Sequence, residues 1–225
     1  MNGPHPPPLN ILYQDNHLLA VYKPPGIPLQ PGRSGTVSLM DLTRARIKTQ
    51  HGKPGNVFLG LVHRLDQPVA GLVLFAKTSK AASRLSRQFR EKTPKKIYRA
   101  VVEGTPDPPT GNLIHYLRKE KSLKATVFPR SAPGAKRAEL SYTLIETLEG
   151  GSLLEVDLLT GRFHQIRAQL AFTGHPILGD VKYGASSPLP GRLIALYAWK
   201  LIIRHPISGE ETLLESPAPP GWPFL

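Results

Sequence analysis

Three polar side chains, His63, Arg64 and Asp66, interrupt the aliphatic segment "LGLVHRLDQPVAGLVLFAKT" of residues 59–78. The residues that follow them have the composition of a buried strand. A carboxylate among aliphatic side chains is costly to ionise unless a cation or several hydrogen-bond donors face it. In an extended segment, Arg64 would lie on the same face as Asp66. A local ion pair is therefore one explanation for Asp66, and a catalytic carboxylate is the other.

A second isolated charge lies in "FHQIRAQLAFT", residues 163–173, where Arg167 is the only fully charged side chain. On a helix, His164 and Arg167 would share a face with alanines, whereas a solvated face would carry Lys and Glu. We therefore expect Arg167 to be enclosed, and an enclosed guanidinium needs an anion. The sequence favours Asp66 as that anion. Arg167 would then lower the pKa of Asp66 from about 3.9 by about one to three units, which suits a nucleophile or an electrostatic stabiliser.

Other site chemistries find little support in the sequence. The chain contains no cysteine, which excludes disulfides, thiolate metal sites and thiol nucleophiles. It has no phosphate-binding G-x-x-x-x-G-K loop, no G-x-S-x-G nucleophile elbow and no second carboxylate close to Asp66. His164, His175 and Asp180 match no standard metal-ligand spacing. We expect His175-Pro176 and Gly179-Asp180 to shape a turn instead.

Strands outnumber helices in the expected order of elements. Asp15 and Asn16 separate two β-rich runs and predict a hairpin. Further strands are expected over residues 70–77, 95–104, 124–129, 138–148, 152–159 and 192–205. Helices are expected within segments 38–52, 78–92 and 161–174. Ser38 and Ser79 are the expected N-caps of the first two, and Gly174 ends the third. Without strict strand–helix alternation, this pattern predicts an α+β fold with a mixed, largely antiparallel sheet flanked by helices and loops.

The charge balance indicates a polyanionic partner. The chain has 29 Lys and Arg against 16 Asp and Glu, a formal net charge of +13, and nucleic acid is the first candidate. The start, "MNGPHPPPLN", has no signal-peptide pattern, and no apolar run approaches the roughly 20 residues of a membrane helix. We expect a cytoplasmic monomer with no membrane contact, a flexible lead-in over residues 1–10 and one domain over residues 11–225.

Four blocks of the sequence resemble, in order, the motifs of the RluA-type RNA pseudouridine synthases. They are "LLAVYKPPGIPLQPG", "HRLDQPVAGLVLFAKT", "KKIYRAVVEG" and "LLTGRFHQIRAQLAFTGHPILGDVKYG". The resemblance covers nearly the whole chain and implies the pseudouridine synthase fold, with a central cleft. It also implies an isomerase that converts uridine to pseudouridine in ribosomal or transfer RNA. That reaction needs no cofactor and no metal.

The resemblance gives roles to individual residues. Asp66 matches the catalytic aspartate, and Arg167 matches its basic partner. Tyr98 matches the active-site aromatic residue, which takes up the proton lost from C5 or packs against the target base. Arg64 would help to hold the flipped-out conformation of the RNA. The residues implied to contact the RNA or the base are His63, Arg64, Arg162, His164 and Gln165.

The sequence departs from the family pattern in three respects. Val69-Ala70 stands where relatives usually have Thr-Ser, and Gln169 stands where they often have His. Many relatives carry an S4-type domain in front, whereas here we expect RNA binding to rest on the catalytic domain. Loops 105–112 and 118–124 are the expected determinants of the target. The alternative is a non-catalytic RNA-binding or ribosome-assembly module on the same fold, in which the catalytic residues would be degraded.

Overall fold

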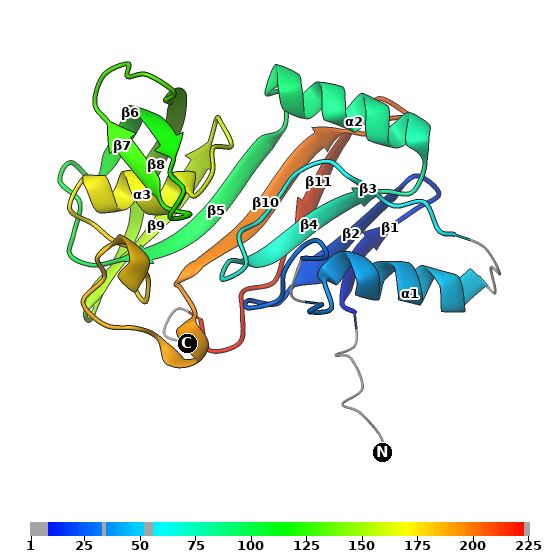
Figure 1. Ribbon diagram of the computed structural model, residues 1–225, viewed down its shortest axis with the longest axis horizontal. Coiled ribbons are helices and arrows are strands. Elements are labelled where there is room, and N and C mark those ends of the chain that lie inside the picture. The colour runs from blue at the N-terminus through cyan, green and yellow to red at the C-terminus, as the bar shows by residue number, and fades with distance from the viewer. Residues whose placement is uncertain (1–8, 33–34, 52–55, 223–225) are drawn as a thin grey trace.

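One sheet runs through the molecule, and helices pack against it (Figure 1). The computed structural model describes residues 9–32, 35–51 and 56–222. In chain order, the described strands are β1 (Ile11–Gln14), β2 (Leu18–Lys23), β3 (Gly60–Leu61), β4 (Ala70–Ala76), β5 (Lys95–Val102), β6 (Thr110–Lys119), β7 (Ala125–Phe128), β8 (Lys136–Leu148), β9 (Gly151–Leu158), β10 (Leu196–Arg204) and β11 (Glu211–Glu215). The helices are α1 (Leu39–His51), α2 (Ser79–Glu91) and α3 (Gln165–Phe172), with short 3-10 helices η1 (Val181–Tyr183) and η2 (Pro190–Arg192). None of the helices in these ranges is long and apolar enough to cross a membrane.

The strand order confirms the expected α+β fold. The strands lie in the order β1-β2-β4-β10-β5-β9-β8-β6-β7, with β11 beside β10 and β3 beside β4. Among these pairs β4 and β10 are parallel, and the others are antiparallel. The expected hairpin between β1 and β2 is present. The carboxylate of Asp15 accepts hydrogen bonds from the backbone N–H groups of His17 and Leu18 and so fixes the turn.

The helix starts agree with the expected ones except for one cap. The hydroxyl of Ser38 accepts a hydrogen bond from the backbone N–H of Asp41, and the Asp41 carboxylate accepts from Ser38 in return. For α2 the predicted cap Ser79 is wrong. Thr78 is the N-cap, because its backbone is extended and its hydroxyl accepts from the N–H of Ala81. Residues 1–8 of the expected lead-in and the predicted end of α1 at Gly52 lie outside the described residues.

Strands β6 and β11 were missed from the sequence. Side chains along β6 are mostly exposed or partly buried, so no apolar run marks it. Its backbone pairing with β8 and β7 holds it in place. In β11, Leu214 alone is buried, and pairing with β10 defines the strand. Both strands depend on neighbours that a local pattern does not reveal.

Apolar side chains cover both faces of the sheet. Val21 of β2 belongs to a large buried cluster that includes Ile47 of α1 and Ile166 of α3. Its neighbour Ala20 belongs to a separate cluster with Leu85 of α2. Successive side chains of a strand point to opposite faces. The face that packs against α1 and α3 is therefore opposite to the face that packs against α2.

A row of paired residues crosses the middle of the sheet. Lys23 of β2 pairs with Gly71 of β4, Gly71 pairs with Ala198 of β10, and Ala198 pairs with Tyr98 of β5. Gly71 has a φ of +111°, and a Cβ atom there would lie 2.3 Å from the carbonyl oxygen of Ala198. The parallel contact between β4 and β10 therefore requires glycine at this position.

We predict that Gly71→Ala lowers the free energy of unfolding by about 3 kcal/mol, because the added methyl group pushes β4 and β10 apart. The matched control is Gly174→Ala, since Gly174 also has a positive φ (+89°) but an added Cβ would meet nothing within 4 Å. Backbone strain alone should cost that variant about 1–2 kcal/mol. Urea unfolding followed by tryptophan fluorescence measures both, and equal losses would contradict the steric explanation.

Candidate active site

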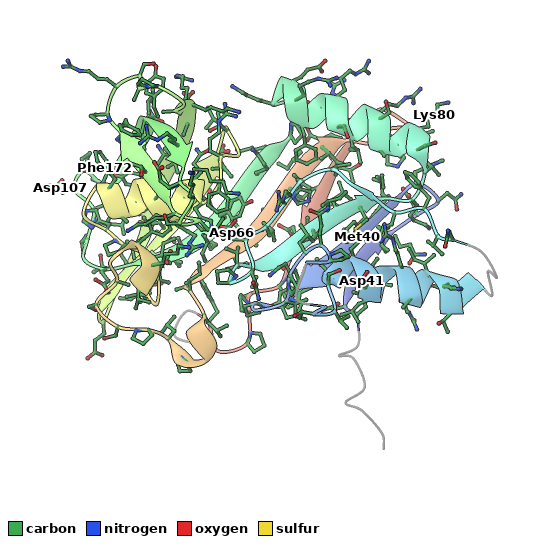
Figure 2. The ribbon with its side chains drawn as sticks, viewed as in Figure 1. Met40, Asp41, Asp66, Lys80, Asp107 and Phe172 are labelled. Atoms are coloured by element: carbon green, nitrogen blue, oxygen red, sulfur yellow. The ribbon has the colours of Figure 1, made fainter. Side chains whose placement is uncertain are left out.

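The loop from β3 into β4 carries Asp66 to the middle of the sheet. Figure 2 shows Asp66 between the part of the molecule that carries α3, where Phe172 is labelled, and the part that carries α1, where Met40 and Asp41 are labelled. The cross-strand row places Lys23 of β2 and Tyr98 of β5 on either side of the start of β4. The fold thus brings β2, β5 and α3 around the loop that carries this carboxylate.

Asp66 is desolvated but still accessible. Its side chain is 26% exposed, and its Oδ2 lies 3.4 Å from Nη1 of Arg167. Burial raises the pKa of Asp66 above its ordinary value of 3.8, because desolvation outweighs the opposing effects of Arg167 and Lys23. The predicted lowering of this pKa is therefore wrong in direction. Burial is the main reason, and Arg167, which has a second carboxylate as its main partner, offsets it only in part.

That carboxylate is Asp180. Nε and Nη2 of Arg167 donate hydrogen bonds to its Oδ2 and Oδ1 at 2.7 and 2.8 Å, a bidentate arrangement. Arg167 is 5% exposed and Asp180 is 1% exposed, so the predicted enclosure of Arg167 is confirmed. Burial by itself lowers the pKa of Arg167, but the hydrogen bonds that the guanidinium donates to Asp180, together with the charge of Asp180, raise it on balance. The predicted pairing of Arg167 with Asp66 is present, and it is the longer of the two contacts.

His164 and Tyr183 complete the polar group around Asp66. Nε2 of His164 lies 3.6 Å from Oδ2 of Asp66, and Nδ1 lies 2.8 Å from the hydroxyl of Tyr183. The guanidinium carbon of Arg167 lies 5.1 Å from the centroid of the Tyr183 ring. Burial, together with nearby cations, lowers the pKa of His164 to about 3. His164 is therefore a neutral imidazole near pH 7.

Lys23 is a buried charge that sequence reasoning did not single out. Its Nζ donates hydrogen bonds to the backbone carbonyls of Pro24, Gln67 and Val69, and the side chain has no exposed surface. Two of these acceptors follow Asp66 in the chain, so Lys23 ties the Asp66 loop to β2. Burial lowers the pKa of Lys23 to about 7, although the charge of Asp66 opposes this change. A lysine at the end of an apolar run was the available signal.

Tyr98 of β5 lies close enough to Asp66 for the charge of that carboxylate to act on it. It is 8% exposed, and burial, followed by the charge of Asp66, raises its pKa well above the ordinary value of 10.0. A phenol that is so difficult to ionise is a poor general base near neutral pH. Tyr98 therefore offers the site an aromatic surface more readily than a proton acceptor.

Two of the residues predicted to contact RNA have surface available for it. Arg64 is exposed, two positions before Asp66 in the chain. Arg162 is partly buried, and its Nε donates a hydrogen bond to the carbonyl of Arg137. Their contacts with RNA remain predictions.

His63 and Gln165 have partners inside the protein. Nε2 of His63 accepts a hydrogen bond from the backbone N–H of Leu74, and its ring stacks on Phe89 with centroids 5.2 Å apart. Gln165 is 3% exposed, and its side-chain oxygen accepts a hydrogen bond from the hydroxyl of Thr160. These contacts give both residues a part in shaping the loops around Asp66, and their contacts with RNA remain predictions.

The remaining polar residues of this region serve the fold. Among the described residues, no group of three or more His, Cys, Asp or Glu side chains is arranged to hold a metal ion. Nδ1 of His175 contacts the carbonyl of Glu103, and the N–H of Asp180 donates to the carbonyl of Ile177 in the expected turn. Gln169 is fully buried and donates to the carbonyl of Leu113.

The two expected specificity loops are shorter than predicted, since β6 begins at Thr110 and ends at Lys119.

Comparison with known proteins shows which class of protein has this site. A family model described as RNA pseudouridylate synthase matches residues 17–172, which include Asp66, Tyr98 and Arg167. This chain belongs to the RNA pseudouridylate synthase family. It is 35% identical over 229 residues to ribosomal large subunit pseudouridine synthase D of Nitrosomonas europaea, which covers 94% of this chain and 62% of that protein. It is 34% identical over 216 residues to dual-specificity RNA pseudouridine synthase RluA of Haemophilus influenzae, which covers 93% of each.

Solved structures support the same assignment for this pseudouridylate synthase family member. The fold is similar to that of human RNA pseudouridylate synthase domain containing 4, with a TM-score of 0.78 and 26% identity. The similarity covers 94% of this chain and 89% of that one. The fold expected from the sequence motifs is thereby confirmed.

The raised pKa of Asp66 generates a stability prediction. As pH rises above 3.8, the unfolded chain loses this proton before the folded protein does, so the stability contributed by Asp66 falls through the raised pKa. Asp66→Asn should therefore unfold at higher urea concentration than the wild type at pH 7, with a gain of about 1 kcal/mol that shrinks toward pH 4.

The control for this comparison is Glu146→Gln, which makes the same change of carboxylate to amide at an exposed position of β8. Its stability should follow that of the wild type at both pH values. An Asp66→Asn variant that is less stable than the wild type at pH 7 would contradict the raised pKa.

Proposed function

We propose that this protein isomerises uridine to pseudouridine in structured RNA, with Asp66 acting as nucleophile or base on the flipped-out nucleotide. The observation that carries the proposal is the state of Asp66. Its Oδ2 contacts the buried guanidinium of Arg167, while 26% of the side chain remains exposed to a substrate. Membership of the RNA pseudouridylate synthase family supports the proposal, as does the presence of Tyr98 beside the carboxylate.

The reaction breaks the N1–C1′ bond, turns the base and joins C5 to C1′. The proton on C5 is lost and N1 gains one, so the base is rearranged without oxidation or group transfer. Asp66 either attacks C1′ or removes the C2′ proton, and the ionised carboxylate serves either route. Desolvation favours both, because a carboxylate with a raised pKa is the stronger base and the less hydrated nucleophile.

In this proposal Tyr98 packs against the target base. A role as base toward the C5 proton would require the phenolate, and burial disfavours that form. The flat ring instead offers stacking surface to the uracil after it has left the RNA stack.

The proposed substrate is ribosomal or transfer RNA. The net charge of +13 favours binding of the phosphate backbone, and the exposed side chain of Arg64 would help to hold the flipped-out conformation of the RNA. Such contacts offset the few kcal/mol that unstacking a uridine costs. Relatives are named for the ribosomal large subunit and for dual specificity. We propose a cytoplasmic monomer that needs no metal or cofactor and selects its target through the loops within residues 105–112 and 118–124.

We predict that Asp66→Asn slows isomerisation by at least about 1,000-fold while RNA affinity stays within about threefold of the wild type. The reason is that an amide can neither attack C1′ nor remove the C2′ proton, whereas the charge that binds phosphates is unchanged. Release of tritium from RNA labelled at uridine C5 measures the rate, and filter binding measures the affinity. Glu146→Gln should match the wild type in both assays.

The alternative, a non-catalytic RNA-binding module, predicts a different outcome in the same experiment. Wild-type protein would then bind RNA without releasing tritium above the background. Normal tritium release by Asp66→Asn would instead refute the role of Asp66.

A further inference from the structure

A chain of hydrogen bonds favours one tautomer of His164. The backbone N–H of Ala125 donates to the hydroxyl oxygen of Tyr183 at 2.8 Å. The hydroxyl hydrogen of Tyr183 is then available to Nδ1 of His164, which lies 2.8 Å away. A neutral imidazole that accepts at Nδ1 carries its hydrogen on Nε2. Nε2–H is therefore the group that faces Asp66.

The surroundings of His164 hold its ring in place. The residue has a φ of +53°, which is an uncommon backbone conformation for a residue other than glycine. Its ring stacks on Phe163 with centroids 3.8 Å apart, and Nζ of Lys119 lies 4.7 Å from the centroid of Phe163. A residue held in a sparsely populated backbone conformation by its surroundings is typical of a functional position.

The two donors that face Asp66 approach the same oxygen. Nη1 of Arg167 lies 3.4 Å from Oδ2, and Nε2 of His164 lies 3.6 Å from Oδ2. Within the described residues, Oδ1 of Asp66 accepts no hydrogen bond. Both donors thus lie on the Oδ2 side of the carboxylate, where Arg167 makes a hydrogen bond and His164 lies just beyond hydrogen-bond distance.

We propose that His164, as its Nε2–H tautomer, is a positioning residue that acts with Arg167 to hold Oδ2 of Asp66, so that Oδ1 is the oxygen that meets the ribose. This inference rests on the proposed function. It replaces RNA contact as the role of His164. The 3.6 Å separation is slightly long for a hydrogen bond, and such contacts tighten when a substrate closes the site.

The test compares His164→Gln with His164→Leu in single-turnover and steady-state tritium release. The amide N–H₂ of glutamine can reach the place of Nε2, whereas leucine has similar bulk and no donor. We expect His164→Leu to lower kcat by about 100-fold with little change in KM, and His164→Gln to retain activity within about tenfold of the wild type.

Equal losses of kcat in the two variants would overturn the proposal, and so would a raised KM with unchanged kcat, which indicates RNA contact. Thermal melting of both variants confirms that they are folded. Wild-type turnover together with an inactive Asp66→Asn in the same assay keeps this test separate from the proposed function.

A second variant tests the tautomer without altering His164. Tyr183→Phe removes the donor to Nδ1, so His164 can place its hydrogen on either nitrogen. We expect kcat to fall in the wild-type background and to change no further in the His164→Gln background, because glutamine has no tautomer to set. The same fold-loss in both backgrounds would overturn the tautomer assignment.

Discussion

The buried guanidinium of Arg167 is the constraint on which the site depends. A charge this deep in the protein is tolerated only when anions face it. Asp180 takes two of its N–H groups, and one further nitrogen is directed at Asp66. Arg167 therefore orients the carboxylate of Asp66, while most of the positive charge of Arg167 is compensated by Asp180. This arrangement requires three segments to be positioned together: helix α3, the turn before η1 and the loop before β4.

Burial displaces the pKa values of two groups in the site, Asp66 and Lys23, in opposite directions. Asp66 keeps too little compensation to offset its desolvation, and Lys23 is buried with backbone carbonyls as its hydrogen-bond partners. Both groups lie close to the cross-strand row that passes through Gly71. Stability is lost at such positions, and the rest of the sheet must supply it. The result is a carboxylate that is oriented and poorly hydrated.

The sequence predicted those features of the fold and the site that depend on residues near one another in the chain. The isolated charge of Arg167 among alanines predicted its enclosure, and the apolar run at β4 predicted a buried strand. Asp180 was interpreted as a turn residue, because nothing near it in the sequence reveals that it meets Arg167 in the folded chain. The direction of the Asp66 pKa was wrong because the burial of this carboxylate, and the presence of Asp180 beside the same cation, are properties of the tertiary structure.

We propose that this protein forms pseudouridine in cellular RNA and that Asp66 is the catalytic group. This proposal is tested most directly by mapping pseudouridine across total RNA from cells with the gene, without it, and complemented with wild-type or Asp66→Asn protein. We expect specific uridines to lose the modification on deletion, to regain it with the wild type and to stay unmodified with Asp66→Asn. An unchanged map on deletion, or full restoration by Asp66→Asn, would contradict it.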